Sequence, residues 1–201
     1  MKNGIYMLCG GEGVFAQDLL NSFIITDDQG TVIVIDGGHA QNLPPFLKRL
    51  KEITGKEVPR INAWILTHPH DDHIECFTEL MKTQPDAVVV DKLYYNFQYT
   101  GEEFIKEMGG HSRVMFDMMR DFYVDLISFK GEIVIPELYD KFAVGEFNFE
   151  VLHTAKVPTG AFDCNNKSLV LKMSFSGKTV MLLADAGVPS GNKILETFPA
   201  E

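Results

Sequence analysis

The chain has 201 residues, a formal net charge of −10 and 45% hydrophobic residues, which is the balance of an ordinary soluble globular protein. Its apolar stretches are far shorter than the ~20 residues that a membrane-spanning helix needs. Three cysteines without regular spacing indicate a reducing compartment, most simply the cytoplasm, and export followed by signal removal stays open. Because acidic and basic residues are mixed along the chain, a general nucleic-acid surface is disfavoured, and a small or locally bound substrate fits better.

The first part of the chain predicts a hairpin, a helix and a buried strand. Residues 22–26 and 32–36 are β-rich runs, and the turn-forming residues between them predict an antiparallel hairpin. Two prolines then open a predicted helix over residues 44–54, which Gly55 ends. Residues 63–67 follow as a short buried strand.

A second helix and strand follow. Apolar residues recur at helical spacing, with Asp72 as the predicted N-cap: Ile74, Phe77, Leu80 and Met81. Residues 87–91 predict another buried strand, and this order of elements indicates an α/β layer architecture. A helical insert is expected around residues 101–130.

The second half of the chain predicts more strands. They cover residues 147–153, 168–175 and 179–184, and Ser176-Gly177-Lys178 makes the last two a hairpin. Ser190 or Gly191 is the predicted cap of a final helix. We find no linker and no internal repeat, so residues 1–201 are expected to form a single domain.

The strongest chemical signal is His68-x-His70-x-Asp72-His73, directly after a buried strand. Imidazole and carboxylate groups are ligands of divalent metals. Because alternate residues of an extended segment point the same way, His68 and His70 can converge on one ion, while Asp72 and His73 can face a second. The alternative, a histidine-rich surface loop, is disfavoured by the strand that precedes the motif. The sequence therefore predicts half of a binuclear site.

This pattern resembles the metallo-β-lactamase superfamily of metallo-hydrolases, whose HxHxDH motif is matched in full. Asp36 with its two following glycines matches the family's aspartate at the end of an early strand, and Asp185 matches the aspartate that bridges two metals. The stretch from Asn165 to Ser168 resembles the Asn-x-x-Ser stretch of a narrower subgroup. That subgroup includes the hydrolase domain of competence DNA-uptake proteins and phosphorylcholine esterases.

The resemblance implies an α/β fold of the four-layer αββα type and a site built from the matched residues. The implied metal ligands are His68, His70, Asp72, His73 and Asp185. His153 is the candidate for a further ligand, with a packed histidine as the alternative. Asp36 would support a ligand histidine, and Asn165, Asn166 and Ser168 would orient an anionic substrate, although these types are also ordinary turn residues.

The implied function is that of a metal-dependent hydrolase, with Asp72 as the candidate catalytic residue. Two divalent ions, zinc first and manganese or iron as alternatives, would generate hydroxide at neutral pH. Phosphodiesters or related esters are the expected substrates. The family's last histidine ligand has no counterpart after Asp185, so we expect a C-terminally truncated chain, a degenerate member or a site completed by another subunit. The alternative function is a non-catalytic metal-binding or interaction module of the same fold; the oligomeric state is left open.

Overall fold

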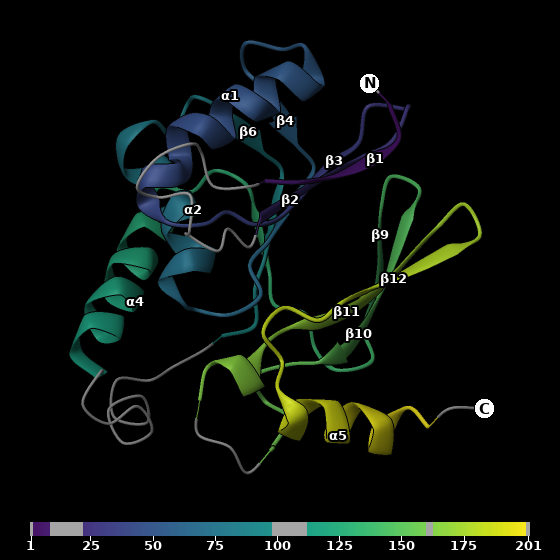
Figure 1. Ribbon diagram of the computed structural model, residues 1–201. Coiled ribbons are helices and arrows are strands. Elements are labelled where there is room, and N and C mark those ends of the chain that lie inside the picture. The colour runs from purple at the N-terminus through teal and green to yellow at the C-terminus, as the bar shows by residue number, and fades with distance from the viewer. Residues whose placement is uncertain (1, 9–21, 98–111, 160–162, 200–201) are drawn as a thin grey trace.

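The structure is a computed structural model that describes residues 2–8, 22–97, 112–159 and 163–199. Within these ranges, two β-sheets pack face to face between helices (Figure 1). The first sheet has six strands in the order β1-β2-β3-β5-β7-β8, and the second has four in the order β12-β11-β10-β9. A separate two-stranded sheet pairs β4 with β6.

The first sheet combines an antiparallel and a parallel half. Its strands are β1 (Gly4–Met7), β2 (Ser22–Thr26), β3 (Val32–Asp36), β5 (Ala63–Ile65), β7 (Lys92–Tyr94) and β8 (Glu132–Val134). The predicted hairpin is confirmed, because β2 and β3 are antiparallel with Ser22 opposite Asp36. From β3 onward, neighbouring strands run parallel. The ends of β3 and β5 therefore lie at the same edge of the sheet.

Three helices cover one face of this sheet: α1 (Leu43–Thr54), α2 (Asp71–Thr83) and α4 (Ser112–Leu126). A 3₁₀ turn, η1 (Ala40–Asn42), leads into α1, and Gly55 ends that helix at φ 67°, as predicted. Trp64 of β5 is fully buried beneath them, with its ring 5.0 Å from that of Phe46 and 5.2 Å from that of Phe77. These contacts form the first hydrophobic core.

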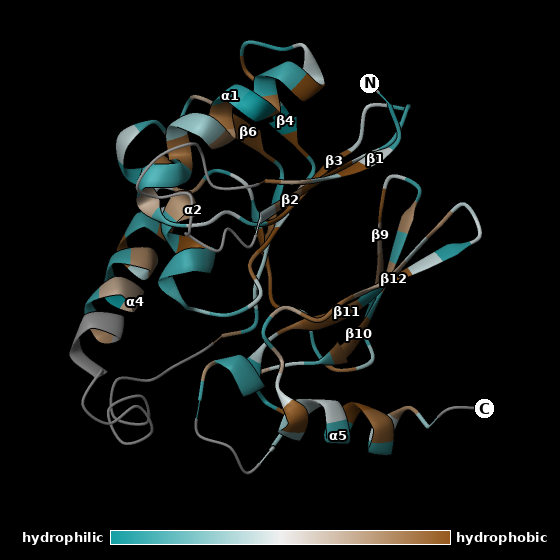
Figure 2. Cartoon of the chain, in the orientation of Figure 1, coloured by the Kyte–Doolittle hydropathy of each residue, from teal (hydrophilic) through white to brown (hydrophobic). Residues whose placement is uncertain are grey.

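The second sheet packs on the other face of the first. Its strands are β9 (Lys141–Val144), β10 (Phe147–His153), β11 (Val170–Phe175) and β12 (Lys178–Leu182). A second core lies between the sheets, where Phe149 and Val151 of β10 join Ile33 and Ile65. Hydrophobic residues concentrate in the strands of the two facing sheets (Figure 2). The helix α5 (Val188–Thr197) contacts β10 and the 3₁₀ turn η3 (Asn165–Lys167), which completes the order of layers expected for an αββα sandwich.

Three expectations about element boundaries are wrong. Helix α2 begins at Asp71 with His70 as its N-cap, so Asp72 lies inside the first turn. The apolar run at 87–91 does not supply the interior strand: Val89–Val90 is the short strand β6, beside β4 (Arg60–Ile61), and Val89 is 47% exposed. The interior strand is β7, three residues further on. Helix α5 starts after Gly187, earlier than predicted, because Pro189 fits the first turn of a helix.

The helical insert is confirmed in part. Helix α4 falls inside residues 101–130, whereas 101–111 lie outside the described residues. Strands β8 and β9 were not predicted, since their short runs mix charged and apolar residues. In the described part of the chain, no helix has both the length and the apolar character needed to cross a membrane.

Candidate metal centre

The candidate site lies where the parallel strands β3 and β5 end. Asp36 is the last residue of β3, and the segment after β5 carries Thr67 and His68. Asp36 and Ala184, which precedes Asp185, are non-glycine residues in the left-handed region, at φ 53° and 49°. Such backbone strain concentrates at functional sites. Two segments that are distant in the sequence thus take uncommon conformations beside the predicted ligands.

The structure brings the predicted ligands together. One ligand atom each of His68, His73 and Asp185 lies within 4.8 Å of the others. His73 Nε2 is 3.6 Å from Asp185 Oδ1 and 3.6 Å from Asp72 Oδ2, and His68 Nε2 is 3.0 Å from His70 Nδ1. The motif and the aspartate after β12 therefore form one cluster of nitrogen and oxygen donors.

Asp36, to which the resemblance assigns the support of a ligand histidine, lies behind this cluster. Its Oδ1 accepts a hydrogen bond of 2.8 Å from the Thr67 backbone N–H, and its Oδ2 accepts one of 2.8 Å from the Thr67 hydroxyl. The same Oδ2 is 2.8 Å from His73 Nδ1. The carboxylate thus orients His73 so that Nε2 faces Asp72 and Asp185.

Thr67 is a site residue that the sequence analysis missed. Its hydroxyl lies 3.2 Å from His68 Nδ1 as well as 2.8 Å from Asp36 Oδ2, and the residue is buried. Its position between the strand and the first histidine could have indicated a role at the site. Threonine is common in β-strands, however, so this position alone is weak evidence for such a role.

Burial keeps most of the histidines in the neutral form that binds metals. Burial, helped by the neighbouring histidines, lowers the pKa of His68 to about 2. Burial also lowers the pKa values of His70 and His153. For His73, burial lowers the pKa, but Asp36 and the other nearby carboxylates together raise it above its usual value. A divalent cation could take the place of a proton between His73 and these carboxylates.

His153 ends β10 next to a bulge in the pairing with β11. Its Nδ1 is 2.9 Å from the Ser168 carbonyl oxygen, and because a carbonyl only accepts, Nδ1 carries the proton. The Nε2 lone pair is buried and has no hydrogen-bond partner among the described residues. This is the state expected of a ligand histidine. His153 is nevertheless not part of the close group formed by His68, His73 and Asp185.

The predicted substrate-orienting residues are placed differently from one another. The Asn165 side chain lies close enough to His68 to oppose the lowering of its pKa, and the buried Asn165 Oδ1 has no hydrogen-bond partner among the described residues. The Ser168 hydroxyl is buried without a partner in the described part of the chain. Asn166 instead donates from Nδ2 to Asp163 Oδ2 at 2.9 Å, and its Oδ1 accepts from the Ser190 N–H at 3.2 Å. The Asn166 amide therefore links η3 to α5.

The unpartnered nitrogen of His153 and the converging donors fit a divalent metal. Nitrogen and carboxylate donors of this kind suit zinc and also accept manganese or iron. Asp72 and Asp185 have side chains that are 25% and 33% exposed, whereas the His73 side chain is fully buried. The cluster is therefore open to solvent on its carboxylate side.

Comparison with models of protein families matches this chain to one family. A family model described as the metallo-beta-lactamase superfamily matches residues 18–161. A solved structure from Thermotoga maritima, described as a candidate metallo-beta-lactamase, aligns with a TM-score of 0.52 and 16% identity, over 96% of this chain and 91% of that one. At this identity the likeness shows the fold alone. A search of curated proteins returns no match.

Two further solved structures are longer proteins. A Cronobacter sakazakii metallo-beta-lactamase with a HARLDQ motif aligns with a TM-score of 0.48 and 13% identity, over 81% of this chain and 54% of that one. A subclass B3 metallo-beta-lactamase isolated from a soil metagenome library has a TM-score of 0.49 and 12% identity, over 81% of this chain and 55% of that one. This chain thus spans about half the length of either protein.

Proposed function

Because this chain belongs to the metallo-beta-lactamase superfamily, we propose that it is a metal-dependent hydrolase with its centre at His68, His70, Asp72, His73 and Asp185. The observation that carries the proposal is the convergence of His68, His73 and Asp185 to within 4.8 Å at the end of two parallel strands. His153, with its free Nε2, is the further ligand. We propose two divalent ions, with zinc as the first choice.

The metal supplies Lewis-acid polarisation and a nucleophile at neutral pH. The chain's own residues prepare the site for it. Asp36 and Thr67 hold the ring of His73 in one orientation, and burial keeps His68 neutral. The partly exposed carboxylates of Asp72 and Asp185 mark the side from which a substrate can approach. Asp72 is accordingly the candidate catalytic residue.

The proposed substrate is a phosphodiester or a related ester, ahead of lactams and thioesters. Support comes from the Asn-x-x-Ser stretch and its likeness to the subgroup of DNA-uptake hydrolase domains and phosphorylcholine esterases. Asn165 contacts His68, and the Ser168 hydroxyl has no partner among the described residues, so both could donate to an anionic oxygen. Asn166 is the weakest member of the predicted set, since its amide is already engaged.

The test is hydrolysis of bis-p-nitrophenyl phosphate by the zinc-loaded protein. We expect turnover that EDTA abolishes and added zinc restores, and that Asp185→Asn removes. Asp71→Asn is the matched control, because Asp71 occupies a variable position within the motif, its side chain is 61% exposed, and it is not one of the proposed ligands. If the metal-loaded protein hydrolyses neither phosphodiesters nor a panel of esters, lactams and thioesters, the proposal is wrong.

A second candidate function is a non-catalytic metal-binding module. It is favoured by one observation: among the described residues, a single group of three side chains converges closely enough to hold one ion. This alternative predicts one metal per chain and no turnover of any ester. Metal stoichiometry measured together with the hydrolysis assay separates the two functions.

A further inference from the structure

A cavity of about 360 Å³ lies between the two sheets, at the end of the sandwich opposite the metal centre. The strand register places it there. Gly4 and Thr26 line the cavity and pair with each other, whereas Asp36 pairs with Ser22 at the other end of the β2–β3 hairpin. At ~3.3 Å per residue, the length of these strands separates the cavity from the cluster by roughly 15 Å. Residues of β1 and of the hairpin formed by β11 and β12 line it.

The walls of this cavity are largely apolar. Phe147 and Met173 are 2% and 3% exposed and form its inner part. The ring of Phe147 stacks on that of Phe175, with 4.5 Å between centroids and 24° between planes. Ile5, on β1, is 49% exposed, and Val180 of β12 also lines the cavity. Its neutral polar lining residues are Asn3, Thr26 and Ser176. An apolar group that entered would therefore replace water against a preformed aromatic wall.

Lys178 is the one charged residue that lines the cavity among the described residues. It is exposed at the first position of β12, and within the described ranges no carboxylate forms an ion pair with it. An ammonium group beside an apolar cavity favours a ligand with a negative head and an apolar tail.

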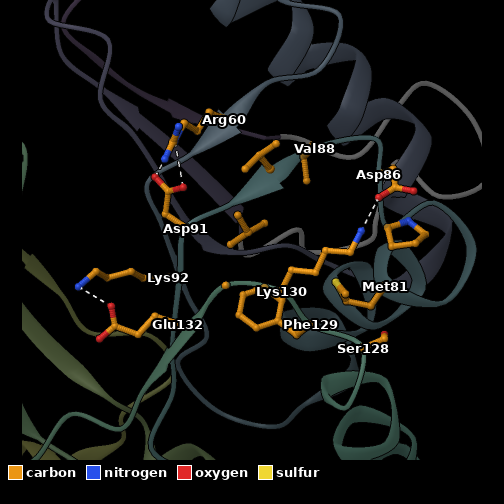
Figure 3. A pocket seen from close by; sticks show the side chains of 14 residues that line it. Arg60, Met81, Asp86, Val88, Asp91, Lys92, Ser128, Phe129, Lys130 and Glu132 are labelled. Carbon is orange, nitrogen blue, oxygen red and sulfur yellow. Dashed lines mark hydrogen bonds and ion pairs between the residues drawn. The ribbon is translucent and has the colours of Figure 1, made fainter.

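Another cavity, of about 460 Å³, lacks this property (Figure 3). It also has an apolar floor, formed by Met81, Val88 and Phe129. Each cation at its rim is already paired with an anion: Arg60 with Asp91, Lys92 with Glu132, and Lys130 with Asp86. The charges at its rim are therefore balanced within the protein, so this cavity favours neither an anionic nor a cationic ligand.

We propose that the cavity beside Lys178 binds an amphipathic carboxylate, with the alkyl chain against Phe147, Met173 and Val180 and the carboxylate on the Lys178 ammonium. The volume lies near the lower limit of small-ligand pockets, which are ~300–1,000 Å³, so a short or medium chain fits. This site is separate from the metal centre and does not depend on the proposed hydrolase activity.

The test is calorimetric titration of the full chain with hexanoate, octanoate and decanoate, below their micelle-forming concentrations. We expect the affinity to rise about fourfold for each added methylene until the cavity is full. Heptyltrimethylammonium, which has the same seven-carbon tail as octanoate and the opposite charge, should bind more weakly than octanoate. Equal binding of the two head groups would overturn the proposal.

Two variants locate the binding. Lys178→Gln should weaken octanoate binding about threefold to fivefold, as expected for loss of one exposed ion pair, while Lys48→Gln, at an exposed lysine on α1, should leave it unchanged. Val180→Trp should abolish binding by filling the cavity, with folding checked by circular dichroism and zinc content unchanged. If Lys178→Gln and a folded Val180→Trp both bind octanoate like the wild type, the proposal is refuted.

Discussion

At the scale of single residues, the Thr67 hydroxyl determines which nitrogen of His68 is free to bind a metal. The hydroxyl has one proton, which it donates to Asp36 Oδ2 at 2.8 Å. Its lone pairs can then accept from His68 Nδ1, 3.2 Å away. This directs the Nε2 lone pair of His68 toward the cluster, where His70 Nδ1 lies 3.0 Å away and where a metal would take its place as the partner. Asp36 has the same effect on His73 through Nδ1, at 2.8 Å.

Replacing Thr67 by valine should therefore weaken metal binding while keeping the shape of the side chain. We expect the zinc affinity of Thr67→Val to fall by ~10- to 100-fold, which is typical when a partner of a metal ligand is lost. Thr67→Ser retains the hydroxyl and is the control, with a much smaller change. Competition with a zinc chelator measures both. Wild-type affinity in a folded Thr67→Val protein would show that the hydroxyl does not orient the histidine.

The closeness of the candidate ligands could be anticipated from the sequence, because four of them lie within six residues of the chain. Spacing alone brings His68, His70 and His73 to one place, and the strand before them makes the segment extended. The role of Thr67 could not be predicted, because it depends on Asp36 from another strand. The sequence analysis gave Asn166 a role in orienting the substrate. Its amide instead hydrogen-bonds Asp163 and Ser190, which only the folded chain brings beside it.

At the scale of elements, Asn166 joins two segments that have few other links. Its Oδ1 accepts from the Ser190 N–H in the first turn of α5, and the Ser190 hydroxyl donates 2.9 Å to the Asn166 carbonyl oxygen. Gly187, just before α5, has no side chain, and a Cβ there would lie 3.0 Å from Asn166 Oδ1. The amide therefore ends the loop after β12 and fixes the start of α5.

Asn166→Ala should loosen this connection without removing a metal ligand. We expect the free energy of unfolding to fall by ~1–3 kcal/mol, because the buried Ser190 N–H loses its acceptor, Asn166 Oδ1. Amide hydrogen exchange should quicken in α5 more than in α1. Asn148→Ala, at an exposed position of β10, should change neither quantity. Unchanged exchange in α5 of the Asn166 variant would contradict this role.

Elements with a clear periodic pattern were predicted, and those whose identity depends on pairing were not. The β2–β3 hairpin and α1 carry their own turn and cap residues. The apolar run at 87–91 reads as a strand on its own, yet β7 takes the interior place because it pairs with β5 and β8. Pairing partners lie far apart in the sequence, so a local pattern cannot choose between neighbouring runs.

At the scale of the whole molecule, the candidate site joins the two sheets. His68 and His73 follow β5 of the first sheet, and Asp185 follows β12 of the second. The two sheets already share the hydrophobic core that lies between them, and a metal bound at the edge of this core would add a second connection between the two halves. Metal binding should consequently stabilise the entire fold and not only its site.

Zinc should therefore raise the melting temperature of the protein. At a free zinc concentration of 100 times Kd, the gain in stability is about 2.7 kcal/mol. For a chain of this size, that corresponds to a shift of roughly 5–10 °C. Asp185→Asn should lose most of the shift, while Asp71→Asn should keep it. Identical melting curves in zinc and in EDTA would mean that the cluster does not connect the sheets through a metal.

The most direct test of the central claim is the number of metal ions bound per chain. Inductively coupled plasma mass spectrometry on the purified, zinc-equilibrated protein gives this number. We predict two zinc ions per wild-type chain, and loss of at least one of them in His73→Ala, with Asp71→Asn again as the control. A wild-type protein that holds one zinc ion or none would contradict the proposed binuclear hydrolase centre.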